Sequence, residues 1–201
     1  LEDIYPLLVS IKKLNNLYKK KYYISLSIYD NTDNYFRFKS SDFDFLEMSV
    51  NYFHNPNNVG FGKANNYNFF KNNTNSGDLF IISNPDTSFE PESLIKFIDC
   101  FQNQSSIVCA NPLIRNINRE IQFSSKRNPT ILSLLLGFFP FLLFFNPFFK
   151  YDFYHKNKKQ DYTLDTFKSQ FLSGSFLVVK AEIFAKVKGF SEAYFLHFED
   201  A

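Results

Sequence analysis

Polar side chains that could bind a ligand follow several stretches predicted as strands. Asp30 comes directly after residues 22–29, and Asp86 lies just beyond residues 79–83. Asn58 follows a third such stretch. In α/β sheets, ligands bind beyond the carboxyl ends of the strands. Because all three residues fall at such ends, we expect a ligand-binding site there.

The asparagine-rich loop after the second predicted strand contains two closely spaced glycines. Gly60 and Gly62 would let the backbone approach a ligand closely, because glycine lacks a Cβ. Lys63 could face phosphate groups, although a solvated lysine explains it equally well. Asn65 and Asn66 could bind ribose or backbone groups, or could cap a helix that begins nearby.

An acidic pair, Glu199 and Asp200, stands near the end of the sequence. Adjacent carboxyl groups raise one another's pKa when both are partly buried, and a carboxylate can then act as a general base. Taken alone, such a pair is usually a solvated surface feature. His197, beside the pair, is a weak candidate for contact with a substrate.

The elements that would position these residues alternate between helix and strand. Apolar residues at helical spacing predict a helix over 4–18, and Pro91 at a first helical position predicts another helix up to about residue 101. A short helix at 181–187 is closed by Gly189. Strands are predicted at 22–29, 48–54, 79–83, 107–110 and 176–179. This alternation is typical of an α/β sheet covered by helices, with polar, turn-rich sequence at 31–45.

Composition excludes several classes of function. The chain has 201 residues and a net charge of +2, which is too small to argue for nucleic-acid binding. The 28 Phe and 12 Tyr are best explained by codon bias in an AT-rich genome, so they do not indicate stacking on carbohydrate or RNA. Cys100 and Cys109 lack the spacing of a zinc site, and so few cysteines suit a reducing cytoplasm.

Residues 131–149 carry no charge and are long enough for a transmembrane helix. Residues that interrupt helices argue against one straight span: Gly137, Pro140, Asn146 and Pro147. Lysines follow the segment, and apolar surface beside lysines suits the anionic face of a membrane. We therefore expect residues 131–160 to form a membrane-proximal insertion that makes peripheral contact. A buried helical hairpin under the sheet is the alternative.

Taken in order, the motifs resemble those of family 2 glycosyltransferases, in the rhamnosyltransferase-like branch. The matching elements span nearly the whole chain: Asp30-Asn31; Asn58-Val59-Gly60-Phe61-Gly62-Lys63-Ala64-Asn65-Asn66; Asn84-Pro85-Asp86-Thr87; residues 173–180; and residues 189–201. Each element alone is weak, but five in this order make a specific pattern. Ser191 departs from it, standing where the family has Asp. Asn34 stands in place of the usual Ser-rich spacing, which weakens the case for base contacts beyond Asp30.

The resemblance implies a GT-A-type fold, a Rossmann-like mixed sheet that is mostly parallel and flanked by helices. It implies one incomplete domain over residues 1–201, with a first strand expected before Leu1 and a helix after the acidic pair. The implied activity is inverting transfer of a sugar from a nucleotide-diphosphate donor, for which the branch suggests dTDP-rhamnose. The apolar segment 131–149 motivates the expectation of a lipid-linked or polysaccharide acceptor, destined for a capsule or O-antigen. We expect it to be used in the cytoplasm, at the inner face of the cell membrane.

The resemblance also assigns roles to individual residues. Asp200 would be the catalytic base, with Glu199 as the second choice, and Asp86 would bind a divalent cation, Mg or Mn. Contacts with the nucleotide-sugar are implied for Asp30, Asn31, Asn58, Gly60, Phe61, Gly62, Lys63, Asn65, Asn66 and Asn84. Contacts with the sugar or acceptor are implied for Ser173, Gly174 and His197. Without the other motifs, residues 84–87 would be interpreted as a turn that caps the next helix.

Two other functions stay open on the sequence alone. A nucleotidyltransferase could use a similar α/β sheet, but the elements around Ser173 and Glu199 favour glycosyl transfer. A non-catalytic membrane-associated domain would work through residues 131–149. The same alternative includes a degenerate paralogue that has lost catalysis, and the presence of Asp86 and Asp200 argues against such a loss.

Overall fold

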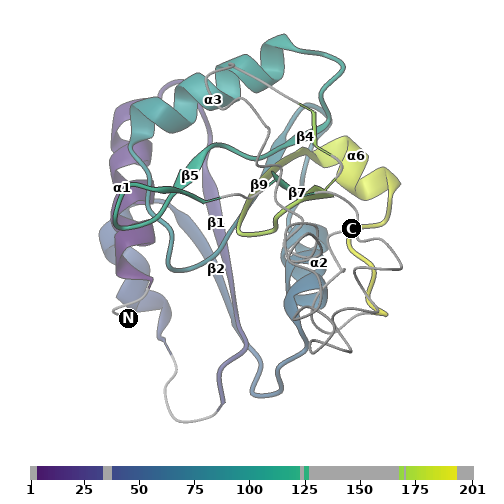
Figure 1. The fold of residues 1–201 in the computed structure, drawn as a ribbon. Coiled ribbons are helices and arrows are strands. Elements are labelled where there is room, and N and C mark those ends of the chain that lie inside the picture. The colour runs from purple at the N-terminus through teal and green to yellow at the C-terminus, as the bar shows by residue number, and fades with distance from the viewer. Residues whose placement is uncertain (1–3, 34–37, 123–124, 127–167, 170, 194–201) are drawn as a thin grey trace, which may run out of the picture. The chain divides into compact units, whose positions relative to one another are not determined.

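The computed structural model describes residues 4–33, 38–122, 125–126, 168–169 and 171–193 (Figure 1). The chain divides into two compact units, Leu1–Pro112 with Gly174–Asp200, and Leu113–Ser173 with Ala201. The second unit contains two short antiparallel strand pairs. They are β5 (Ile114–Arg115) with β6 (Ile121–Gln122), and β7 (Ser125–Lys126) with β8 (Phe171–Leu172). The apolar segment 131–149 and the lysines after it lie outside the described residues.

In the first unit, β1 (Ser25–Asp30) and β2 (Ser49–His54) form a parallel pair. Side chains alternate between the two faces of a strand. On one face, β1 and β2 pack against α1 (Tyr5–Tyr18) and the 3-10 helix η1 (Ser40–Leu46). The centre of this core is Leu8, Phe43 and Leu46, all almost fully buried.

Helix α2 (Phe61–Lys71) contacts β1 from the face opposite to that core. The ring of Tyr67 lies 5.2 Å from that of Tyr29 and 4.5 Å from that of Phe53. Asn68 donates a hydrogen bond to the main-chain carbonyl of Ser27 at 3.4 Å. Strands β1 and β2 therefore lie between α1 and α2, as Figure 1 shows.

A second sheet of the same unit has the order β3–β9–β4, with β9 (Phe176–Lys180) antiparallel to both neighbours. The outer strands are β3 (Leu79–Ser83) and β4 (Cys109–Ala110). Four consecutive residues of β9, 176–179, are buried, which explains their uninterrupted apolar sequence. Helix α6 (Ala181–Lys186) follows β9 directly, and its Phe184 packs on Phe80 of β3.

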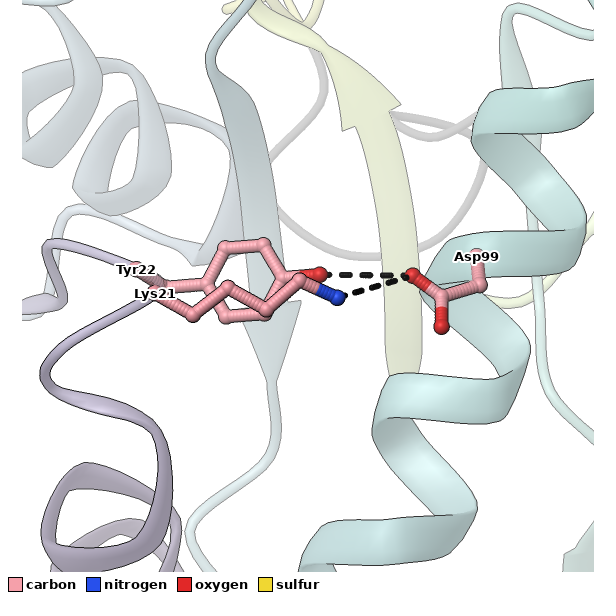
Figure 2. Close-up of polar contacts among 3 residues, drawn as sticks. All are labelled: Lys21, Tyr22 and Asp99. Atoms are coloured by element: carbon pink, nitrogen blue, oxygen red, sulfur yellow. Dashed lines mark hydrogen bonds and ion pairs between the residues drawn. The ribbon is translucent and has the colours of Figure 1, made fainter.

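Helix α3 (Pro91–Asn103) begins at the proline that predicts its start, and its apolar face is buried at Leu94, Ile95, Ile98 and Phe101. Polar contacts connect this part of the chain to α1 in two places. One joins the segment before α3 to α1, and the other joins α3 to the loop after α1. The Ser10 hydroxyl accepts a hydrogen bond from the Phe89 amide at 3.1 Å. At the other end, the Tyr22 hydroxyl and the Lys21 ammonium both approach one carboxylate oxygen of Asp99, at 3.3 and 3.7 Å (Figure 2).

A long cavity of about 1140 Å³ runs between β1 and β3. Among the described residues, β1 pairs only with β2, and β3 pairs only with β9. The cavity is lined by both strands and by apolar residues of α1 and α3, such as Ile11 and Ile98. The strand that the resemblance implies before Leu1 stays a prediction.

The predicted α/β class is confirmed, as are the helices at 4–18, 91–101 and 181–187 and the strand at 79–83. The strand expected over 22–29 begins later, at Ser25. The expectation of a mostly parallel sheet differs from the structure, because one of the five described ladders is parallel. The reason is that β9 returns antiparallel between β3 and β4. None of the helices in the described ranges is long and apolar enough to cross a bilayer.

We predict that Leu8→Ala lowers the free energy of unfolding by about 2–5 kcal/mol, because Leu8 is fully buried under β1 and β2. The matched control is Leu17→Ala in the same helix, where the side chain is 60% exposed and the change should stay within about 0.5 kcal/mol. Urea unfolding followed by circular dichroism measures both. Equal effects of the two substitutions would contradict the described packing of α1.

Candidate functional site

Asp30 ends β1 with its carboxylate held by three hydrogen bonds. One oxygen accepts from the main-chain N–H of Thr32 at 2.9 Å and from its hydroxyl at 2.7 Å. The other oxygen accepts from the Tyr52 hydroxyl at 2.7 Å. This arrangement fixes the carboxylate at the carboxyl end of the strand.

The pKa of Asp30 is lowered although burial acts to raise it. The hydrogen bonds from Thr32 and Tyr52 stabilise the carboxylate, and nearby His54 adds a smaller electrostatic contribution. The His54 ring itself lies 3.0 Å from the Thr32 carbonyl oxygen. Asp30 is therefore ionised at neutral pH and acts as a hydrogen-bond acceptor.

The loop before α2 is attached to the end of β1 through side-chain amides. Asn31 accepts a hydrogen bond from the Val59 N–H at 3.3 Å, and Asn58 accepts one from the Gly60 N–H at 2.9 Å. Gly60 is buried with φ +89°, a conformation that favours glycine, and α2 begins at the next residue. The loop thereby brings Asn65, on the first turns of α2, to the cavity beside β1.

The end of β3 is connected to the segment before β9. The Asn84 N–H donates to the Ser175 carbonyl at 2.9 Å, which places Gly174 near the same strand end. The Thr87 hydroxyl donates to the Asn84 carbonyl at 2.9 Å, so residues 84–87 do form a closed turn. Asp86 is exposed on this turn.

Five of the predicted donor-site residues line one cavity, the cavity between β1 and β3. They are Asp30, Asn31, Phe61, Asn65 and Asn84. They come from β1, from α2 and from the residues directly after β1 and β3, which are distant in sequence. Residues that end or follow both strands therefore border the same cavity.

Other predicted residues lie elsewhere in the described part of the chain. Asn58 and Lys63 are exposed, Gly62 is buried within α2, and none of the three lines the cavity. Asn66 is buried, and its amide is bonded to Phe190 rather than directed at the cavity. A ligand contact by Asn66 would require breaking those bonds.

The predicted acceptor and catalytic residues are only partly described. Ser173 belongs to the second unit, whereas Gly174 belongs to the first. His197, Glu199 and Asp200 lie outside the described residues. Their predicted roles therefore stay predictions.

A divalent cation at Asp86 would depend on ligands beyond the described protein residues. Within the described ranges, no group of three or more His, Cys, Asp or Glu side chains could hold a metal ion. Mg²⁺ is often bound by one or two carboxylates together with phosphate oxygens of a substrate. One exposed carboxylate on the turn after β3 fits that mode but not a site made by the described residues alone.

Sequence reasoning did not identify Thr32 and Tyr52 as parts of the Asp30 site. The Thr32 contact has a local signal, because Asp side chains often bind the backbone two residues later. The Tyr52 contact depends on the register of β1 and β2, in which Asp30 lies beside His54 and Tyr52 is two residues away. No local pattern contains that register.

The chain is similar to two curated relatives, the N-acetylglucosaminyl-diphospho-decaprenol L-rhamnosyltransferases of Mycobacterium tuberculosis strains CDC 1551 / Oshkosh and ATCC 25618 / H37Rv. Each is 28% identical over 152 residues, which are 71% of this chain and 48% of the relative. The chain thus spans about half the length of the curated relatives it matches. No family model and no solved structure matches the chain. Both relatives are named as rhamnosyltransferases.

We predict that Tyr52→Phe destabilises the protein by about 1.5–3 kcal/mol at pH 7, because the Asp30 carboxylate loses a hydrogen bond. A carboxyl group with a lowered pKa stabilises the fold above its unfolded pKa, and this contribution is lost as the pH falls through its folded pKa. The penalty of Tyr52→Phe should therefore shrink below about pH 4. Urea unfolding between pH 2 and pH 7 measures it.

The matched control is Tyr23→Phe, because the Tyr23 side chain is 88% exposed. We expect a change within about 0.5 kcal/mol at every pH. A Tyr52→Phe penalty that stays constant over the whole pH range would contradict the role given to Asp30.

Proposed function

We propose that the chain is the donor-binding part of an inverting glycosyltransferase that uses a nucleotide-diphosphate sugar. The observation that carries the proposal is that Asp30, Asn31, Asn65 and Asn84, at or near the carboxyl ends of β1 and β3, line the cavity between these strands. The similarity to two rhamnosyltransferases supports the same class of reaction. Polar groups that converge on one cavity are the usual mark of a small-molecule site.

Asp30 is proposed to recognise the base of the donor. An ionised carboxylate offers about four acceptor positions, and among the described residues Thr32 and Tyr52 use three of them. The remaining position can accept the imide N–H of uracil or thymine. This chemistry suits a UDP-sugar or dTDP-sugar, and the branch that the motifs resemble favours dTDP-rhamnose.

The diphosphate is proposed to lie near the turn after β3. A divalent cation, Mg or Mn, would neutralise its charge, with Asp86 as the protein carboxylate that binds it. Asn84, which lines the cavity beside this turn, can donate to a phosphate or ribose oxygen through its side-chain amide.

Asp200 is proposed to be the general base. It removes the proton from an acceptor hydroxyl, whose oxygen bonds to the anomeric carbon while the bond from that carbon to the diphosphate breaks. The nucleoside diphosphate leaves from the opposite side, so the configuration is inverted. Glu199 is the second choice for the base, and Ser173, Gly174 and His197 are proposed to line the sugar or acceptor site.

The acceptor is proposed to be lipid-linked. The uncharged residues 131–149 and the following lysines suit contact with an anionic membrane face, at the cytoplasmic side of the cell membrane. The curated relatives are named for an acceptor in which N-acetylglucosamine is joined through diphosphate to decaprenol. The same acceptor class is our proposal for this chain, as a step in cell-surface glycan synthesis.

We predict that dTDP or UDP binds the chain more tightly with Mn²⁺ than without it, and that Asp86→Ala removes this difference. In the wild-type chain, Mn²⁺ should lower the Kd of the nucleotide at least about tenfold, which corresponds to about 1.4 kcal/mol. In Asp86→Ala, the Kd should be the same with and without Mn²⁺. Isothermal titration with each nucleotide, with and without Mn²⁺, measures it. Asp44→Ala is the matched control, because Asp44 is also exposed but lies in η1. Metal-dependent binding that survives in Asp86→Ala would refute the assignment of Asp86.

We also predict that Asp200→Asn lowers kcat for sugar transfer by about 10²–10⁴-fold, because the amide cannot accept the proton. The assay uses dTDP-rhamnose as the donor and N-acetylglucosamine linked by diphosphate to a polyprenol as the acceptor. The variant Glu199→Gln is measured in the same assay for comparison. The nucleotide Kd should not change in either variant. A larger loss in Glu199→Gln would transfer the role of base to Glu199, and full activity in both would refute the acidic pair as the catalytic base.

A further inference from the structure

The side chain of Asn66 connects two parts of the chain that are far apart in sequence. It lies on α2, is only 4% exposed, and its carbonyl oxygen accepts from the Phe190 N–H at 2.8 Å. Its amide nitrogen donates to the Phe190 carbonyl at 3.0 Å and to the Glu192 carboxylate at 3.1 Å. The side chain thereby pairs with both main-chain groups of one residue.

The turn that receives Asn66 is shaped for this contact. Gly189 has φ +77°, and a Cβ at that position would lie 2.2 Å from the Asn66 carbonyl oxygen. A side chain at residue 189 would therefore displace the amide, in addition to straining the backbone. The Phe190 ring packs against Phe61 and Phe184, with centroid distances of 5.6 and 5.2 Å.

Consecutive residues of α2 face two different parts of the molecule. Asn65 lines the cavity between β1 and β3, whereas Asn66 holds the turn at 189–192. Phe61, at the start of the same helix, both lines that cavity and touches Phe190. One helix therefore ties the cavity to the turn.

Apolar packing alone does not explain an asparagine at this position. A buried amide is costly unless its hydrogen bonds are made, whereas an apolar side chain of similar size would pack without that cost. Two hydrogen bonds to the same residue fix its position and its orientation, which apolar contacts do not specify. The geometry thus favours a role in setting the path of the chain.

We propose that Asn66 is a positioning residue for catalysis. By fixing Phe190, it holds the turn at 189–192, and in the sequence Glu199 follows Glu192 by seven residues and Asp200 by eight. The proposal rests on the proposed function, in which this acidic pair supplies the base. It replaces the predicted contact of Asn66 with the nucleotide-sugar.

The test is Asn66→Asp, which has nearly the same shape. The carboxylate can still accept from the Phe190 N–H, but it cannot donate to the Phe190 carbonyl, and it repels Glu192. We expect kcat to fall about tenfold to 100-fold while the KM for the donor changes by less than about twofold. Hydrogen exchange at residues 189–193 should become faster, measured by mass spectrometry on the full chain.

Two further variants separate positioning from loss of folding. In Asn66→Asp combined with Glu192→Gln, the glutamine amide can donate to the new carboxylate, so we expect part of the lost kcat to return. Asn103→Asp makes the same chemical change at an exposed position at the end of α3 and should leave kcat, KM and exchange unchanged.

A rise in KM at constant kcat would overturn the proposal in favour of direct contact with the donor. Unchanged kcat in Asn66→Asp would also overturn it. If the wild-type chain transfers no sugar and binds neither dTDP nor UDP, the proposed function fails. Wherever transfer is absent, hydrogen exchange decides on Asn66 alone. If hydrogen exchange at residues 189–193 is unchanged in Asn66→Asp, Asn66 does not hold the turn and the proposal is overturned. Faster hydrogen exchange confined to that turn would support it.

Discussion

Strand β9 is a late part of the chain that lies between two earlier strands, β3 and β4. Its residues 176–179 are buried, so their main-chain groups must find partners within the protein. The antiparallel register that satisfies them also fixes the segments at both ends of β9. Ser175 meets Asn84 at one end, and α6 begins at Ala181 at the other. This pairing joins the early and late parts of the chain, as does the contact of Asn66 with Phe190.

Asparagine has a structural use in this protein that composition does not reveal. Codon bias can explain why asparagine is frequent, but not where its side chains bind. Asn31 and Asn58 hold the loop before α2, and Asn68 and Asn72 attach that helix to Ser27 of β1. Asn31 and Asn58 accept through the amide oxygen, whereas Asn68 and Asn72 donate through the amide nitrogen. One short side chain carries both groups, whereas Lys only donates and ionised Glu only accepts.

Local signals made much of the fold predictable. Pro91 marks the start of α3, and the apolar run at 79–83 marks β3, because both signals act within a few residues. The motifs likewise placed Asp30 and Asn84 at strand ends. Helix η1 was hidden because its buried residues, Phe43 and Leu46, lie in a polar stretch. The antiparallel return of β9 and the contact of Asn66 with Phe190 depend on long-range packing, which a single sequence does not contain.

The cavity between β1 and β3 has a consequence for handling the protein. On the sides that face it, both strands lack a ladder partner among the described residues. Unpaired strand edges are templates for extended segments of any chain, because the main-chain groups they offer are the same at every residue. Self-association through these edges would increase with protein concentration and would depend little on side-chain identity. Its products would be sheet-rich oligomers without a fixed number of subunits.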